Sequence, residues 1–451
     1  MQQSAAMSSV TPLRPAAPRS RRRVHLPAVA LTVLLAACGS STGTPSPSLA
    51  PTPAPSATAP QSVAPSPQSS ASLADVYAQI NRQVQAIRGL PEKQPVEPTI
   101  VSPDEMTAIL KKQNDAEEPT ALLSAYERLY HGMGVLPKTD KLADVFLDLL
   151  SSQVGGLYVP SDKKLYVVSK EGGVGPLEKF LYSHEYTHAL QDQNFDLQKF
   201  QPDSLQDQSD EQMARQALVE GDAYVTMTYW LQQNASPSDR AAVFAGSNDP
   251  TAQQALQKIP PLIASQILFS ALQGTIWVLQ LQMAGGYPAV NAAFADPPQS
   301  TEQVLHPEKY ASHEAPIDVQ LPADLATRMG KDWKVGLQDT FGEHQLGVWI
   351  TDEIPNTAAL PPPPPAGAAG WGGDRVALLD GPNGQWAIVL KTEWDTANDA
   401  AEFEAAIAPR VAQAGGPGKV LPGEGDTVRW VVIGSDDQTL AKAANVLGLA
   451  G

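Results

Sequence analysis

The spacing of apolar residues changes along the chain. Between residues 73 and 150, apolar positions recur every three or four residues, which predicts helices with one buried face. The clearest run is Val76, Ile80, Val84 and Ile87. Residues 155–169 instead carry two short runs of Tyr and Val around a Pro-Ser-Asp-Lys turn, which is typical of a β-hairpin. We therefore expect a helical subdomain over 73–150, followed by a hairpin.

Three further segments have helical character. Residues 177–193 follow a Gly-rich loop and a proline, which is favoured in the first turn of a helix. Residues 209–233 open with Ser, Asp and Glu, which suit a helix N-terminus. Residues 260–284 are apolar and uncharged, but Ser and Gln interrupt them. We expect a buried helix there that packs on the other two, with a membrane-inserted helix as the less favoured alternative.

From about residue 321, short apolar runs alternate with helical segments. The runs at 375–381, 385–394 and 427–435 predict strands, whereas 396–413 and 437–447 predict helices. The chain as a whole is therefore expected to have an α+β fold. We expect a mainly helical domain with a small hairpin sheet over 73–320, and a C-terminal α+β module over 321–451.

The N-terminus has the layout of a bacterial export signal. Four arginines between residues 19 and 23 precede an apolar run, 26–37, that is too short to span a bilayer. The sequence Leu-Ala-Ala-Cys-Gly around Cys38 resembles the lipobox of bacterial lipoproteins. We expect a signal peptide over 1–37 and a lipidated Cys38 that anchors the protein to the outer face of the cell membrane. An ordinary secretory signal, an uncleaved anchor and the export route, Sec or twin-arginine, stay open.

Residues 38–72 and the overall charge narrow the possible partners. The segment is rich in Ser, Pro, Ala and Thr and cannot bury enough apolar surface to order itself, so we expect a tether. The net charge is −17, and the five arginines before residue 24 lie outside the expected mature protein. Phosphate backbones would repel so acidic a chain, which argues against a nucleic-acid partner.

The sequence HEYTH carries the first candidate chemistry. His184 and His188 are four residues apart on the predicted helix 177–193, so both imidazoles project from one face. Glu185 is one step round that helix, where it could act as the base for a metal-bound water. Cys38 is the only cysteine, so a zinc site in the folded part must use His and carboxylate ligands.

A third ligand is expected on the predicted helix 209–233. Glu220 lies in a stripe with Met213, Ala217 and Tyr224, and an unpaired carboxylate on so apolar a face is costly. The separation of 32 positions from His188 to Glu220 allows the chain to return as a neighbouring antiparallel helix. The alternative is that Glu220 caps a helix or forms a salt bridge.

The HExxH motif with its downstream Glu resembles the gluzincins, the thermolysin-like zinc metallopeptidases. More narrowly, HEYTHALQDQ, ALVEGDAYV, AAGWGGDRVALL and WDTANDAAEF resemble a poorly characterised family of bacterial secreted or lipoprotein gluzincins. The resemblance implies a zincin-like domain that hydrolyses peptide or protein substrates, with Zn2+ on His184, His188 and Glu220 and with Glu185 as general base. It also suggests His306 and Tyr310 as oxyanion stabilisers, with His313 less favoured.

The chain departs from thermolysin at one position, because Tyr224 stands where that enzyme has an Asp that orients a histidine. We expect Asp222 to point elsewhere, and Asp192 is one candidate for the missing contact. In zincins, an edge strand receives the substrate, and residues 164–168 are a candidate for it. Two other functions stay open: a catalytically silent binding or scaffold lipoprotein with the same fold, and a structural zinc protein with a closed four-ligand site.

Overall fold

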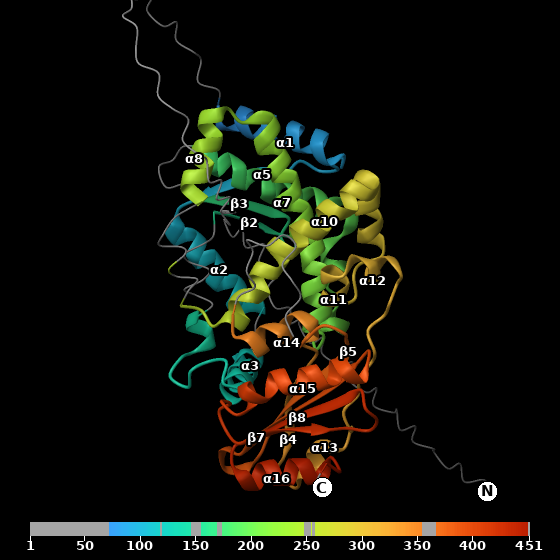
Figure 1. Ribbon diagram of the computed structural model, residues 1–451. Coiled ribbons are helices and arrows are strands. Elements are labelled where there is room, and N and C mark those ends of the chain that lie inside the picture. The colour runs from blue at the N-terminus through green and yellow to red at the C-terminus, as the bar shows by residue number, and fades with distance from the viewer. Residues whose placement is uncertain are drawn as a thin grey trace, which may run out of the picture.

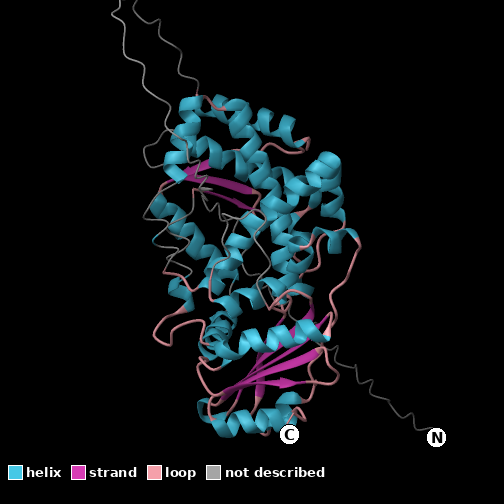
Figure 2. Ribbon diagram, in the orientation of Figure 1, coloured by secondary structure: helices cyan, strands magenta, loops and turns pink. Residues whose placement is uncertain are grey.

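The structure is a computed structural model that describes residues 72–117, 120–145, 155–168, 174–247, 254, 258–353 and 367–449. The expected signal peptide, Cys38 and all but the last residue of the expected tether lie outside the described residues. The fold is α+β, which confirms the predicted class. Helices surround a small sheet in the upper part of the molecule, and a larger sheet forms its lower end (Figures 1 and 2).

Helices form most of the described chain before residue 334. They are α1 (Leu73–Arg88), α2 (Pro103–Glu117), α3 (Thr120–Met133), α5 (Pro176–Phe195), α6 (Leu197–Phe200), the 3-10 helix η1 (Asp203–Leu205), α7 (Ser209–Asn234), α8 (Pro237–Ser247), α10 (Pro261–Ala295), α11 (Thr301–Leu305), α12 (Pro307–Ala311) and α13 (Leu325–Met329).

The small sheet has the strand order β1 (Pro98–Val101), β3 (Lys164–Val168), β2 (Gly156–Val159). Strands β2 and β3 are antiparallel and form the predicted hairpin. Strand β1 pairs with β3 in parallel and was not predicted.

Helix α5 begins and ends for local reasons. Pro176 occupies its first turn after Gly175, where the missing N–H costs nothing. At the other end, Asp196 adopts a left-handed conformation with φ of 60°, and its N–H bonds to the carbonyl of Asp192. Its middle, from Phe180 to Asp192, is entirely buried, and the helix packs mainly against α7, α1, α8 and β2. The predicted helix 177–193 is thus present, extended by a few residues.

Helix α10 is the longest helix and packs along α7. The expected segment 260–284 forms its first two thirds, and the helix bends at Gly286, whose φ of 67° and ψ of −166° are not helical. It is the one helix among the described residues that is long and apolar enough to cross a membrane, with a mean hydropathy of 1.6. However, 67% of that window is buried inside the fold. This burial supports a core helix, as the polar interruptions suggest.

The larger sheet is antiparallel, with the order β4 (Lys334–Asp339), β5 (Trp371–Asp380), β6 (Trp386–Trp394), β8 (Val428–Gly434), β7 (Gly418–Pro422). Between and after its strands come α14 (Gly342–Thr351), the 3-10 helix η2 (Pro382–Gly384), α15 (Ala397–Val411) and α16 (Asp437–Val446). Helices α3, α14 and α15 cover one face, and α13 and α16 cover the other. Because both faces are buried, the central strands read as continuous apolar runs rather than alternating ones.

The segment 73–150 does not form the single helical subdomain that the spacing predicted. Helix α1 packs through Tyr77, Ile80 and Val84 on the core that contains α5 and α7. Helix α3 instead packs on the larger sheet, where Leu129 shares a core with Ile433. Periodicity identifies a helix that has an apolar face, but the face does not specify which distant element covers it.

Candidate metal site

Three potential metal ligands converge between α5 and α7. His184 Nε2 lies 3.0 Å from His188 Nε2, and Glu220 Oε2 lies 3.2 Å and 3.7 Å from these two nitrogens. All three side chains are buried, and Glu220, the most exposed residue of the three, has 3% of its surface accessible. Residues from two helices therefore present two imidazole nitrogens and one carboxylate oxygen to the same point.

The spacing of these atoms suits a tetrahedral metal ion. Ligands about 2.0 to 2.1 Å from a zinc ion, at tetrahedral angles, lie about 3.3 Å from one another. The three distances between the ligand atoms, 3.0, 3.2 and 3.7 Å, bracket that value. Glu220 Oε2 is buried and has no hydrogen-bond partner within the described residues, while Oε1 accepts a bond of 2.8 Å from Gln216. A cation would satisfy the free oxygen.

The electrostatics of the site also favour a positive charge. Burial opposes a charged imidazole at His188, but the Glu220 carboxylate outweighs it and raises the pKa of His188 to about 9. Burial alone would raise the pKa of Glu220, yet the adjacent histidines lower it to about 2. The carboxylate therefore stays ionised while it is surrounded by protein, which is the state that a metal ligand requires.

Glu185 lies beside this cluster and contacts the small sheet. Its Oε2 accepts a hydrogen bond of 2.8 Å from the backbone N–H of Tyr158 in β2. A side chain at Gly156 would collide with its Cγ, at 2.7 Å, so the glycine allows strand and helix to approach closely. The edge strand next to Glu185 is thus β2, whereas residues 164–168 form the central strand β3. Their selection as the edge strand was wrong.

Gln191 contacts His188 at Nδ1, the ring nitrogen that faces away from the other two ligands. Its Oε1 lies 2.9 Å from His188 Nδ1, and its Nε2 donates to Asp222 Oδ2 at 2.9 Å. Asp222 therefore points towards the site rather than away from it. Asp192 instead accepts bonds from Tyr158 Oη (2.7 Å) and from Lys163 (2.6 Å), which tie α5 to the hairpin. Its candidacy as the orienting carboxylate is thus corrected.

His306 and Tyr310 lie in a different cluster. His306 Nε2 is 3.0 Å from Glu343 Oε1 in α14, and the Tyr310 hydroxyl donates to the backbone carbonyl of Asp296 at 2.8 Å. The ring of Tyr310 packs on Trp277. Neither side chain makes a contact with α5 or with Glu220 in the ranges that the structure describes. An oxyanion-stabilising role for them therefore has no geometric support.

A second acidic group lies near this cluster, but it already holds a cation. Glu302, Glu314 and Asp395 are close enough to one another to bind a metal ion. Lys309 Nζ lies between them, 2.7 to 2.8 Å from an oxygen of each. We therefore attribute this group to charge compensation by a lysine.

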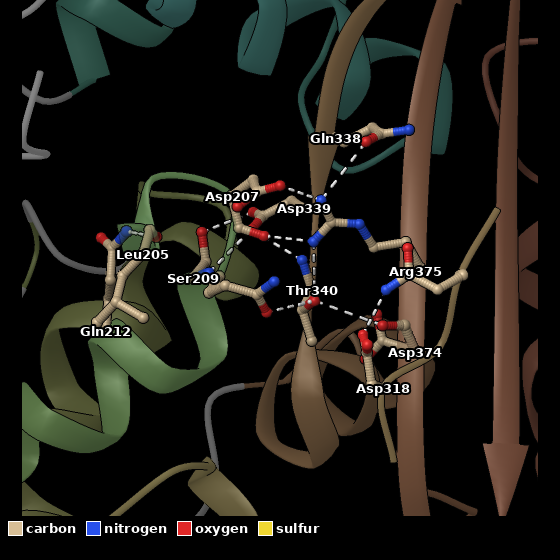
Figure 3. Close-up of polar contacts among 12 residues, drawn as sticks. Leu205, Asp207, Ser209, Gln212, Asp318, Gln338, Asp339, Thr340, Asp374 and Arg375 are labelled. Carbon is tan, nitrogen blue, oxygen red and sulfur yellow. Dashed lines mark hydrogen bonds and ion pairs between the residues drawn. The ribbon is translucent and has the colours of Figure 1, made fainter. Parts of the chain in front are cut away.

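The N-terminus of α7 is fixed to the larger sheet, eleven residues before Glu220 (Figure 3). Asp339, at the end of β4, accepts bonds from the backbone N–H and the hydroxyl of Ser209, at 2.9 and 2.6 Å. In the adjoining turn, Arg375 from β5 binds the backbone carbonyl of Asp207 at 2.6 Å and also its carboxylate. These contacts set the position of α7 along its axis, and with it the position of Glu220.

The larger sheet also carries the family match. Residues 334–446 match a family model described as a domain of unknown function (DUF8575). No curated protein and no solved structure matches the chain. The DUF8575 region runs from the start of β4 to the end of α16, about a quarter of the chain, and contains none of the residues of the metal site. The functional argument therefore depends on the geometry between α5 and α7.

Sequence reasoning missed two parts of the site. Gln191 is three residues after His188, so helical spacing alone could have suggested that the two side chains touch. Arg88, which binds Asp222 from α1, had no such signal, because the two residues are 134 apart in sequence. Arg88 is buried and paired with Asp222 because α1 packs on α5 and α7, which the sequence alone does not reveal.

Proposed function

We propose that the protein is a zinc-dependent peptidase of the gluzincin type, in which His184, His188 and Glu220 hold the metal and Glu185 acts as general base. The observation that carries the proposal is the convergence of three ligand atoms within 3.0 to 3.7 Å, with Glu185 on the next position of the same helix. Three protein ligands of this kind leave a fourth position open, as in catalytic zinc sites.

When bound, a zinc ion supplies a Lewis acid for the peptide carbonyl and lowers the pKa of an attacking water to about 7. The carboxylate of Glu185 accepts the proton of that water and passes it to the leaving amine. The bond from the Tyr158 N–H to Oε2 orients this carboxylate.

Strand β2 supplies a means of aligning the substrate. It is an edge strand, and the Tyr158 N–H points away from β3 and towards Glu185. A peptide in extended conformation could add to this edge, with its backbone groups paired to β2 and its scissile bond beside Glu185. The substrate class is therefore an extended peptide or an unstructured segment of a protein.

One observation favours the alternative, a catalytically silent binding or scaffold protein. His184, Glu185 and His188 are at most 1% exposed. A peptide reaches such a site only if the segments over it move, whereas a site that serves stability alone benefits from burial. The two functions make opposite predictions about hydrolysis.

The test combines metal content and hydrolysis of casein, both measured on the purified full chain. We expect about one zinc per chain in the wild type and weakened binding in Glu220→Gln. Glu185→Gln should retain zinc but lose hydrolysis by about 10²- to 10⁴-fold, the usual contribution of a general base. Glu178→Gln, a carboxylate change in the first turn of the same helix, is the matched control and should keep both. A wild-type chain without zinc contradicts the proposal, and zinc without hydrolysis supports the silent alternative.

A further inference from the structure

Four buried polar side chains connect helix α1 to the metal site. Arg88 and Asp222 have no exposed surface, Gln191 has none, and His188 has 1%. Arg88 Nε lies 2.7 and 2.8 Å from the two carboxylate oxygens of Asp222. Burying an ion pair is costly unless its geometry and further hydrogen bonds compensate, and neither residue belongs to the ligand set.

The surroundings fix the orientation of the Gln191 amide. Its Nε2 donates to two acceptors on α7, the Val219 carbonyl at 3.0 Å and Asp222 Oδ2 at 2.9 Å. Neither acceptor can donate a hydrogen, so the NH2 group must face α7 and the amide oxygen must face His188. A guanidinium group only donates, so the contacts from Arg88 Nε also require Asp222 to act as an acceptor.

This orientation determines where the hydrogen of a neutral His188 ring lies. An amide oxygen only accepts, so the 2.9 Å contact from Gln191 Oε1 requires a hydrogen on His188 Nδ1. The free electron pair then lies on Nε2, which faces His184 Nε2 and Glu220 Oε2. Only that tautomer can donate to a metal at this point.

We propose that Asp222 and Arg88 are positioning residues, which act through the Gln191 amide to hold His188 in its metal-binding tautomer. The inference rests on the proposed metal site and adds residues to it. Asn in place of Asp222 could donate to Gln191, which would leave the Val219 carbonyl as the one acceptor that holds the NH2 group towards α7. The Gln191 amide could then turn over more readily and present its NH2 to His188. That would favour the tautomer with hydrogen on Nε2, which cannot bind the metal.

The experiment measures zinc affinity by competition with a chromophoric chelator, using the full chain. We expect Asp222→Asn to weaken zinc binding about 10- to 100-fold, the usual effect of losing an outer-shell contact to a ligand. Gln191→Met should cause a similar loss while it leaves the Arg88–Asp222 pair intact. In the double variant the two losses should not add, because Asp222 acts only through Gln191.

The control is Glu343→Gln, which changes another buried, hydrogen-bonded carboxylate, one that lies outside the metal site. It should lower the thermal midpoint while zinc affinity stays within about twofold, and its effect should add to that of Gln191→Met. Nitrogen NMR of the zinc-free protein gives a second readout, since it distinguishes the two tautomers of His188 at a pH high enough to keep the ring neutral.

Two outcomes overturn the inference. Wild-type zinc affinity in Asp222→Asn does so, and so do fully additive losses in the double variant. In both cases the proposed peptidase function still stands, provided that the wild-type chain binds zinc. A wild-type chain that binds no zinc removes both proposals. If Asp222→Asn does not fold, Gln191→Met together with the NMR tautomer decides the matter.

Discussion

Asp374 keeps its carboxylate out of solvent where α14 begins. The two oxygens accept bonds from the backbone N–H groups of Phe341 (2.9 Å) and Gly342 (2.7 Å) and from the indole of Trp371 (3.0 Å). Burial nevertheless dominates, and with nearby Asp339 it raises the pKa of Asp374 from 3.8 to about 6. The folded protein thus binds a proton here more readily than the unfolded chain does.

This shift gives a prediction about pH and stability. A raised pKa means that the contribution of Asp374 is fully present below pH 3.8 and is lost as the pH rises through about 6. A rise in pKa from 3.8 to about 6 corresponds to a free energy of about 3 kcal/mol. The free energy of unfolding of Asp374→Asn, relative to wild type, should therefore improve by up to about 3 kcal/mol between pH 3.5 and pH 7.

Denaturant titrations of both proteins across that pH range provide the measurement. The informative quantity is the difference in the free energy of unfolding between the two proteins. The other carboxylates titrate in both proteins, so their contributions cancel in that difference. A difference that does not change with pH would contradict the prediction.

Helices α7 and α10 touch at their backbones beside Glu220, a proposed metal ligand. A Cβ on Gly221 would overlap the carbonyl of Gly274, and a Cβ on Gly274 would overlap the carbonyl of Ala217. Gly221 directly follows Glu220. The distance between the two helices at this point is therefore set by main chain rather than by side-chain packing.

We predict that Gly221→Ala separates the two helices and moves Glu220 with them. Overpacking commonly costs about 1 to 3 kcal/mol, and backbone atoms cannot yield as a side chain can. The thermal midpoint and the zinc affinity should both fall. The control is Gly246→Ala in α8, whose new methyl would meet only the end of Leu177, at 3.0 Å. Unchanged zinc affinity in Gly221→Ala would show that Glu220 does not depend on this contact.

The elements that the sequence predicted are those with a strong apolar pattern of their own, either a helical periodicity or a continuous apolar run. Helix α5 and the ligand helix α7 fall in this group, and so do the central strands β5, β6 and β8. Strands β1, β4 and β7 were missed because they are edge strands, short or interrupted by Gly and Pro, and partly exposed. Their pairing is decided by the neighbouring strand rather than by their own residues.

The same limit applies to the site. His184, His188 and Glu220 could be predicted because helical spacing and ligand chemistry act locally. The buried pair of Arg88 and Asp222 could not, because a long-range polar contact leaves no periodic trace in the sequence. His306 was selected by its residue type, but its partner Glu343 lies outside the metal site.

The DUF8575 region shares its core with helices outside its bounds. Tyr126 and Leu129 of α3 pack on Ile388 and Ile433 on one face of the sheet. Leu325 and Met329 of α13 pack on the other face. The boundaries of the family match, 334 and 446, are therefore not boundaries of packing.

We predict that residues 334–446 expressed alone do not form a stable unit. Without α3 and α13, both faces of the sheet would expose large apolar patches, which promote association. The fragment should bind a hydrophobic dye and unfold without a sharp transition. The full chain should bind little dye and unfold in one sharp transition. A monomeric fragment with a cooperative thermal transition would contradict this prediction.

The pairing of α3 with the last strands also bears on the order in which the protein can fold as it is made. Leu129 and its neighbour Ile433 are about 300 residues apart, and contacts of such long range form late. The apolar face of α3 stays uncovered until β8 has been synthesised. Since Asp339 also fixes the start of α7, the final placement of Glu220 waits for the sheet. Assembly of the proposed metal site is thus a late event that follows the synthesis of β8, and a chain interrupted before β8 would lack it.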